Sequence, residues 1–260
     1  MHLPTVDDPT DPAAARASDL RGFVRALWTS AAFVLLLVVV YVAQGAFSVQ
    51  PFAVSPGTAA GLVGLLTAPL LHGSLEHIVA NAISVLMLGT LAGGVYPRAT
   101  PRALPLLWLG SGLGAWLLGE PGSHHLGASG LTHGLMFLVF SLGVLRRDRP
   151  AIAAAMLGFM FYGGMLLTVL PREPGVSWQS HLGGAVAGIV AAWLLRRRDP
   201  VAPRRRYSWE VEDELAEQAA REARDPFEPP SPRDVPVLWT RDAPADEERG
   251  TVLPFPPRRP

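Results

Sequence analysis

Apolar and polar positions follow one another along this chain in long blocks. Between Trp28 and Leu195 the chain carries only ten of its 44 charged residues, and most of these gather in short clusters between apolar runs. An apolar run of about 20 residues is long enough to cross a bilayer as a helix. The pattern therefore predicts an all-α membrane domain flanked by two charged ends.

Six apolar runs predict a bundle of six transmembrane helices. Charge clusters and prolines mark their limits. The expected helices are 28–47, 71–93, 103–118, 129–145, 151–170 and 178–195. The intervening segment 50–69 contains several prolines, which favours a membrane-associated loop over a further helix.

The placement of arginine predicts how these helices are oriented. Arginines precede the first helix, join the second to the third and the fourth to the fifth, and follow the sixth. They are Arg21, Arg25, Arg98, Arg102, Arg146, Arg147, Arg149, Arg196, Arg197 and Arg198. The loops on the opposite side hold only Arg172. By the positive-inside rule both termini are cytoplasmic, in a plasma or inner membrane.

The two ends of the chain differ in composition from the membrane domain, which we place at residues 21–198. Residues 1–20 are polar and rich in Asp and Pro, and we expect them to be disordered. Residues 199–260 are rich in proline and charge, which predicts a mostly disordered cytoplasmic tail with one helix at 208–224.

Polar residues inside the membrane domain are the first candidates for function, because burying them in a bilayer is costly. His72, His77, Asn81, Ser129 and His181 lie in the second, fourth and sixth expected helices. These helices run in the same direction, so all five residues fall in the outer halves of their helices. Three separate segments thus converge on one depth.

This combination of residue types is typical of nucleophilic catalysis. A serine hydroxyl becomes a good nucleophile when a neutral histidine takes its proton, so Ser129 and His181 form a candidate pair. The Ser129 N–H lies in the first turn of its helix, where it lacks an intrahelical acceptor. His77 and Asn81 share one helix face and could stabilise an oxyanion with that N–H. No Asp or Glu is placed to orient His181, which predicts a dyad.

Glycines explain how two helices could bring these groups together. Gly184 and Gly188 form a G-x-x-x-G pattern in the last expected helix, which allows a close approach to a neighbour. Gly130 and Gly134 offer a matching strip after Ser129. We therefore expect these two helices to pack closely enough for Ser129 to meet His181.

At "GASG", "HGSLEHIVAN" and "SHLGG" the sequence resembles the rhomboid family of intramembrane serine proteases, over about residues 25–197. The resemblance implies a six-helix bundle with an outward-opening cavity, which cleaves transmembrane or membrane-proximal segments of other membrane proteins. It makes Ser129 the nucleophile and His181 the base, with Gly127 and Gly130 framing Ser129. It gives His77 and Asn81 the oxyanion role and His72 an accessory one.

The same resemblance implies that no metal, other cofactor, nucleotide or nucleic acid takes part. The chain departs from the family at position 133, where His133 stands in place of a Tyr or Phe beneath the catalytic histidine. Because His133 lies one turn deeper than Ser129, we expect it to pack under His181 rather than act as the base. The first loop also lacks the Trp-Arg pair that many members have.

Two other classes stay open at this point. One is a catalytically inactive rhomboid-like protein that binds membrane helices. The other is a metal- or haem-binding membrane protein using His72, His77, His133 and His181, although no carboxylate or thiolate completes such a site. The remaining loop histidines, His124 and His125, are expected to be solvated, and Trp108 and Trp116 are expected to serve in packing.

Overall fold

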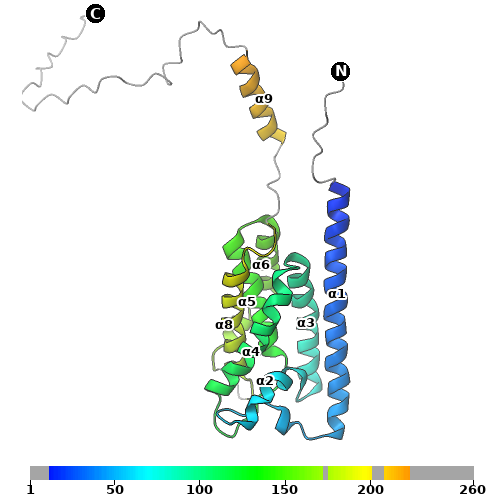
Figure 1. Cartoon of the computed structure of the whole chain (residues 1–260), viewed down its shortest axis with the longest axis vertical. Coiled ribbons are helices and arrows are strands. Elements are labelled where there is room, and N and C mark those ends of the chain that lie inside the picture. Colours follow the sequence, from blue (N-terminus) through cyan, green and yellow to red (C-terminus); the bar gives the residue numbers. More distant parts are fainter. Residues whose placement is uncertain (1–11, 172–174, 201–207, 223–260) are drawn as a thin grey trace, which may run out of the picture. The chain divides into compact units, whose positions relative to one another are not determined.

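The computed structural model describes residues 12–171, 175–200 and 208–222, and its regular elements in these ranges are helices (Figure 1). The chain divides into two compact units, residues 1–203 and 204–260. In the second unit the described element is α9 (Ser208–Glu222), which matches the helix expected in the tail. The rest of the predicted tail, and residues 1–11, lie outside the described residues.

Six longer helices build the first unit. They are α1 (Pro12–Ala43), α3 (Leu75–Val95), α4 (Ala99–Leu118), α5 (Ser129–Arg146), α6 (Arg149–Tyr162) and α8 (Trp178–Leu195). Short helices fill the connections: η1 (Gln44–Ala46), η2 (Gln50–Phe52), η3 (Ala60–Leu62), α2 (Gly64–Thr67), η4 (Ala68–Leu70) and α7 (Met165–Thr168). The expected membrane-associated loop 50–69 is therefore a series of short helical turns.

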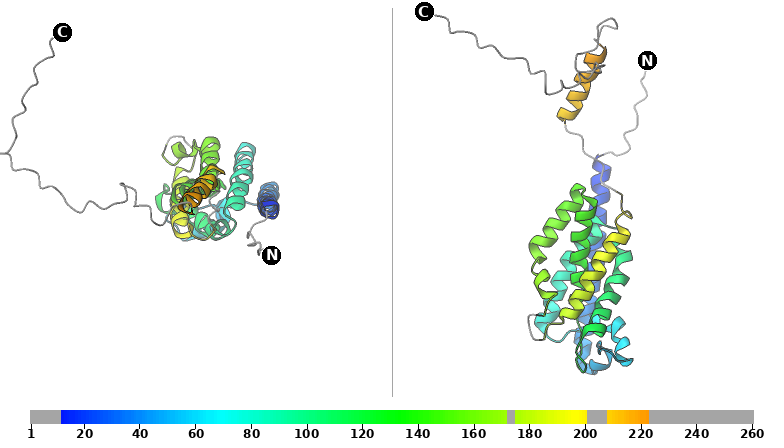
Figure 2. Two further views of the ribbon diagram at one scale, coloured as in Figure 1. Left: turned by 90° about the horizontal axis from the view of Figure 1, so that it is seen from above. Right: turned by 90° about the vertical axis from the view of Figure 1, so that its left-hand side faces the viewer.

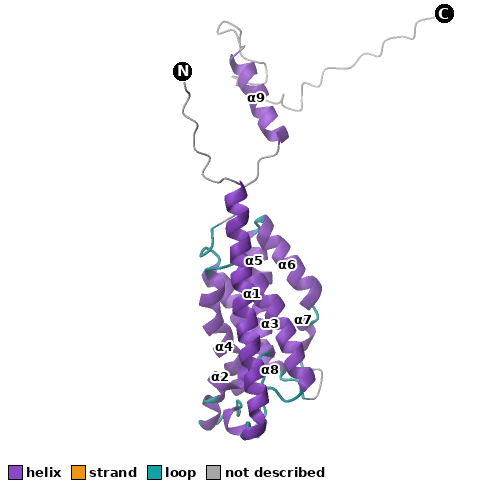
Figure 3. Cartoon of the chain, turned by 90° about the vertical axis from the view of Figure 1, so that its right-hand side faces the viewer, coloured by secondary structure: helices purple, strands orange, loops and turns teal. Residues whose placement is uncertain are grey.

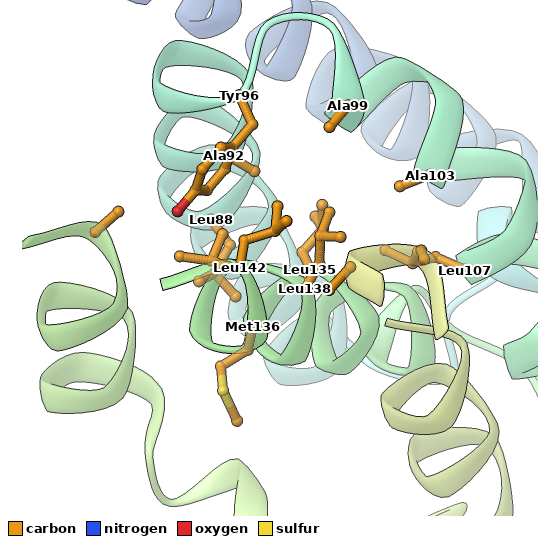
Figure 4. Close-up of a cluster of buried hydrophobic side chains, with 14 of the residues drawn as sticks. Leu88, Ala92, Tyr96, Ala99, Ala103, Leu107, Leu135, Met136, Leu138 and Leu142 are labelled. Atoms are coloured by element: carbon orange, nitrogen blue, oxygen red, sulfur yellow. The ribbon is translucent and has the colours of Figure 1, made fainter. Parts of the chain in front are cut away.

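Helix α5 lies at the centre of the first unit. It contacts α3, α4, α6 and α8, while α1 packs along α3 at the outside (Figures 2 and 3). In agreement with this central position, Leu131 to Met136 are all buried, so the helix has no exposed face in that stretch. A cluster from α3, α4, α5, α6 and α8 forms the core, including Leu88, Leu107 and Leu138 (Figure 4).

Glycines let α5 and α8 approach until their backbones touch. A Cβ added at Gly184 would lie 1.9 Å from the carbonyl oxygen of Gly130. One added at Gly188 would lie 2.4 Å from the oxygen of Gly134. The structure thus brings together the two small-residue strips that the sequence pairs. In a bilayer such close packing replaces the hydrophobic effect as the force between helices.

The observed helix limits correct several expectations. Helix α1 begins at Pro12, so residues 12–20, expected to be disordered, are helical: proline suits the first helical position and three alanines follow it. Helix α3 begins at Leu75 rather than 71, because the Ser74 hydroxyl accepts the N–H of His77 and caps the helix. The expected helix 151–170 breaks into α6 and α7 at Gly163 and Gly164.

Within the described residues, three helical segments are long and apolar enough to cross a membrane: Arg16–Ala46, Leu75–Val95 and Ser129–Arg146. Helix α8 has the bounds expected from the sequence, and α4 extends four residues further toward its N-terminus than expected. The count of six membrane spans stays a prediction.

Buried charged side chains join α5 to α8 at the end of the first unit where both helices finish. Arg146 forms an ion pair with Asp148 at 2.8 Å, and both side chains are less than a tenth exposed. The same guanidinium donates to the carbonyl oxygens of Arg196, Asp199 and Pro200 at 2.8–3.1 Å. One arginine thus ties the end of α5 to the end of α8.

Asp199 completes this charged end and corrects the expected domain boundary. Its carboxylate accepts the N–H groups of Arg98 and Ala99 at 2.8 and 3.0 Å, at the start of α4. These N–H groups lack intrahelical acceptors, and the helix dipole favours a negative charge beside them. Asp199 is only 4% exposed. It belongs to the packed unit and not to a disordered tail.

Candidate active site

A cavity of about 1130 Å³ lies at the N-terminal ends of α3, α5 and α8. It is lined by His77, Asn81, Ser129, His133 and His181, together with parts of the 119–128 loop and α7. Residues from separate segments of the sequence thus meet in one place. Of the sequence-derived candidates, His72 lies beside the cavity rather than on its wall.

Ser129 and His181 are in direct hydrogen-bond contact. The Ser129 Oγ lies 2.9 Å from His181 Nε2. Ser129 is the first residue of α5, and His181 lies in the first turn of α8, where it is 5% exposed. The contact of α5 and α8 at Gly130 and Gly184 places the two first turns side by side.

The partner of the other ring nitrogen of His181 determines which nitrogen carries the proton. Nδ1 lies 3.0 Å from the carbonyl oxygen of Thr168, which can only accept a hydrogen bond. Nδ1 therefore carries the proton, and the lone pair of Nε2 faces the Ser129 hydroxyl. Sequence reasoning did not identify Thr168, and a backbone carbonyl leaves no residue-type signal by which to find it.

His133 stacks on His181 with ring centroids 3.8 Å apart and an interplanar angle of 10°. Its Nδ1 lies 2.7 Å from the carbonyl oxygen of Ser129, so Nδ1 donates. Its Nε2 lies 2.8 Å from Thr168 Oγ1, a hydroxyl that also lies 3.1 Å from the carbonyl oxygen of Met165, so these two acceptors share its proton. His133 contacts the backbone of Ser129 and not its hydroxyl. The structure thus places it beneath the His181 ring, between α5 and α7.

His77 and Asn81 reach the cavity from α3. The His77 ring lies against Gly127, where an added Cβ would be 2.5 Å from the ring, and Gly127 has a φ of +113° that favours glycine. Asn81 is buried, and its Nδ2 has no partner. The Asn81 amide is therefore an unpaired hydrogen-bond donor on the wall of the cavity.

His72 supports this wall from behind. Its ring meets that of His77 edge-on at 5.1 Å, and its Nε2 accepts a long contact of 3.5 Å from the N–H of Ala128. The Gln44 amide holds the backbone of His72 through two hydrogen bonds. Burial, and secondarily His77, lowers the pKa of His72 to about 4, so the ring is neutral at physiological pH.

Two expectations about neighbouring residues are corrected. His125, expected to be solvated, is half-buried, and both its ring nitrogens have serine partners. Trp108 and Trp116 do more than pack. Their indole N–H groups donate to the carbonyl oxygens of Leu66 and Thr58 and anchor the 50–69 segment.

The metal- or haem-binding alternative depends on the four histidines acting together. They instead form two ring pairs, His72 with His77 and His133 with His181. In the described part of the chain, no group of three or more His, Cys, Asp or Glu residues is arranged to hold a metal ion.

The fold and the site define a class: a helical membrane protein with a serine and a histidine in contact inside a cavity. The Rhomboid domain matches residues 59–198, which is more than half of the chain. The chain therefore belongs to the rhomboid family. With its apolar helices, this makes it an integral membrane protein.

Mycobacterial proteins are similar to the same part of the chain. Uncharacterized proteins of Mycobacterium bovis and Mycobacterium tuberculosis are 41% identical over 143 residues, covering 52% of this chain and 60% of theirs. An uncharacterized protein of Mycobacterium leprae is 39% identical over 142 residues, covering 52% and 56%. The matches thus span about three fifths of these relatives, whose names carry no activity.

Proposed function

We propose that this protein is an intramembrane serine endopeptidase that cleaves transmembrane or membrane-proximal segments of other membrane proteins. The observation that carries this proposal is the 2.9 Å contact between Ser129 Oγ and His181 Nε2, with Nδ1 of the same ring engaged by the Thr168 carbonyl. Membership of the rhomboid family supports the same reaction class.

The geometry supports a two-step acyl transfer. His181 Nε2 takes the Ser129 proton as Oγ attacks the substrate carbonyl, and the same nitrogen then returns the proton to the leaving amine. Water, activated by His181, hydrolyses the resulting acyl-enzyme. The Thr168 carbonyl plays the part that a carboxylate plays in a triad, because it fixes the tautomer and faces the imidazolium that forms.

Three donors could stabilise the oxyanion of the tetrahedral intermediate. They are the N–H of Ser129 at the start of α5, the Asn81 amide and the His77 ring. Leaving a buried donor unpaired costs about 1–3 kcal/mol. The unpaired Nδ2 of Asn81 is consistent with a donor reserved for a charge that exists only during the reaction.

The proposal includes a topology with six membrane spans, both termini in the cytoplasm and the cavity opening to the outside. Its support is the distribution of arginine, which places Arg98, Arg102, Arg146 and Arg196 at the end opposite the cavity. Substrates would then be single-span or other transmembrane proteins in the same bilayer.

The test is co-expression of the protein with a panel of single-span membrane proteins. We expect at least one of them to be cleaved by the wild type and by Ser141→Ala, and not by Ser129→Ala. Ser141 serves as the control because it lies on the same helix, about three turns further along. Cleavage that persists in Ser129→Ala would contradict the proposal. A wild type that binds these proteins but cleaves none would instead support an inactive, helix-binding relative.

A further inference from the structure

His125 is held on three sides although it lies in a loop. Its backbone pairs with Val54 through two hydrogen bonds of 2.9 Å. Its Nδ1 lies 2.6 Å from Ser177 Oγ, and its Nε2 lies 2.9 Å from Ser123 Oγ. Ser177 is the N-cap of α8, so this ring joins the loop before Ser129 to the helix that carries His181.

The direction of each proton in this chain of hydrogen bonds can be assigned. Ser123 Oγ donates to the carbonyl of Glu120 at 2.6 Å, so it must accept from Nε2–H of His125. Nδ1 is then an acceptor, and Ser177 donates its O–H to it. Ser177 Oγ in turn accepts the N–H of Ser180 at 3.4 Å and caps α8. Burial, and secondarily His124, lowers the pKa of His125, which favours the neutral ring that this assignment needs.

Ser177 is connected directly to the base. Its carbonyl oxygen accepts the N–H of His181 at 3.2 Å, one helical turn along. On the other side only three residues separate His125 from Ser129. The loop before α5 and the first turn of α8 are therefore joined at two points: by the hydrogen bond between His125 and Ser177, and by the contact of Ser129 with His181.

We propose that His125 and Ser177 are positioning residues that set the separation of Ser129 and His181. This inference rests on the proposed function. The glycine contacts fix how closely α5 and α8 pack, whereas the His125–Ser177 bond fixes the first turn of α8 against the loop that leads into α5. A displacement of about 1 Å between reacting groups can lower a rate by about 100-fold, so such a bond affects turnover more than substrate binding.

Two amide variants, each of which keeps a polar group near the position of one ring nitrogen, separate this role from simple packing. In His125→Asn the side-chain oxygen takes the place of Nδ1 and can still accept from Ser177. In His125→Gln the amide reaches the place of Nε2. This variant keeps the hydrogen bond to Ser123 and loses the hydrogen bond to Ser177. We expect His125→Asn to keep kcat within about 3-fold of the wild type and His125→Gln to lower it by about 10–100-fold, with KM nearly unchanged in both.

A second pair tests the other side of the bond. Ser177→Thr keeps the hydroxyl and should be close to the wild type, while Ser177→Ala should lower kcat as His125→Gln does. Combining His125→Gln with Ser177→Ala should cost little more than Ser177→Ala alone, because both changes remove the bond between His125 and Ser177. Ser177→Ala alone also removes the cap of α8 at the Ser180 N–H. Detergent-purified full-length variants are compared by cleavage rate, by the rate of Ser129 labelling with a fluorophosphonate and by thermal midpoint.

The outcomes separate this inference from the proposed function. If the wild type reacts and His125→Asn and His125→Gln are equally active or equally slow, the positioning role is wrong. Fully additive losses in the double variant would also overturn it. If His125→Gln does not fold, the comparison of Ser177→Thr with Ser177→Ala decides the matter. A wild type that neither cleaves nor labels refutes the proposed function, and the positioning role falls with it.

Discussion

The two ends of the helix bundle are held together by different chemistry. At the cavity end, neutral rings, hydroxyls and carbonyls join α5, α7 and α8 through His133, His181 and Thr168. At the opposite end, the charged side chains of Arg146 and Asp199 join α4, α5 and α8. Among the described residues that line the cavity, Glu120 is the one charged side chain, and it is exposed.

This difference reflects what each end has to do. A buried ion pair such as Arg146–Asp148 is costly to break, because each ion would be left uncompensated in a medium of low dielectric constant. A neutral hydrogen-bonded pair can pass a proton and recover it. The charged end is therefore suited to hold the helices in place, and the neutral end is suited to the proton transfer between Ser129 and His181.

The largest expected effect is the difference in cleavage rate between substitutions of the two stacked histidines. His181→Phe should lower the cleavage rate by at least about 1000-fold, because no other group takes the Ser129 proton. His133→Phe keeps an aromatic ring beneath His181 and loses only two hydrogen bonds, so it should stay within about 10-fold of the wild type. Initial rates at matched expression decide this. A dead His133→Phe beside an active His181→Phe would reverse the assignment of the base.

The next effect concerns the unpaired donor in the cavity. Asn81→Ala should lower kcat by about 10–1000-fold with a smaller change in KM, because the amide acts on charge that develops in the transition state. Ser84→Ala is the control, since Ser84 lines the same cavity and its hydroxyl donates to the carbonyl of Ala80 in its own helix. An effect of Asn81→Ala on KM alone would make it a substrate-docking residue instead.

A smaller effect is expected from widening the contact between α5 and α8. The added methyl of Gly184→Ala would lie 1.9 Å from the Gly130 carbonyl oxygen, so the helices must separate. Overpacking of this kind costs about 1–3 kcal/mol and should also slow cleavage. Gly158→Ala is the matched control, because its methyl would meet Val139 at an ordinary 3.6 Å. Equal thermal midpoints and rates for the two variants would show that the backbone contact is not needed.

The smallest effect on catalysis is expected at the charged end. Asp199→Ala leaves two N–H groups of α4 without acceptors and should lower the free energy of unfolding by about 1–3 kcal/mol. The cleavage rate of the folded protein should change by less than about 3-fold, because Asp199 lies at the end opposite the cavity. Deleting residues 201–260, which spares Asp199, should affect neither quantity strongly. Loss of activity in a stable Asp199→Ala protein would show that the two ends are not independent.

The main features of the site could be anticipated from the sequence. Helix order and direction follow from the apolar lengths and the arginines. Ser129 and His181 each lie in the first turn of a helix, so their common depth could be predicted. The glycine spacing indicated which helices would touch. The family resemblance implied an aromatic ring beneath His181 at position 133, and the place of His133 one turn below Ser129 favoured packing over a role as the base; the two rings do stack.

Other features depend on tertiary contacts that leave no local pattern. Thr168 acts through its carbonyl, which every residue has, and its position depends on the break between α6 and α7 at Gly163 and Gly164. His125 looks like an ordinary loop histidine until Val54, from the first loop, pairs with its backbone. Asp199 follows three arginines and resembles the tail, yet its carboxylate reaches the start of α4.

The central claim, that a neutral His181 activates Ser129, is tested most directly by reacting the purified full-length protein with a fluorophosphonate probe and mapping the modified residue. We expect one modified residue, Ser129, in the wild type and in His133→Phe, and no modification in His181→Ala. Modification of a different serine, or undiminished labelling of Ser129 in His181→Ala, would contradict the account.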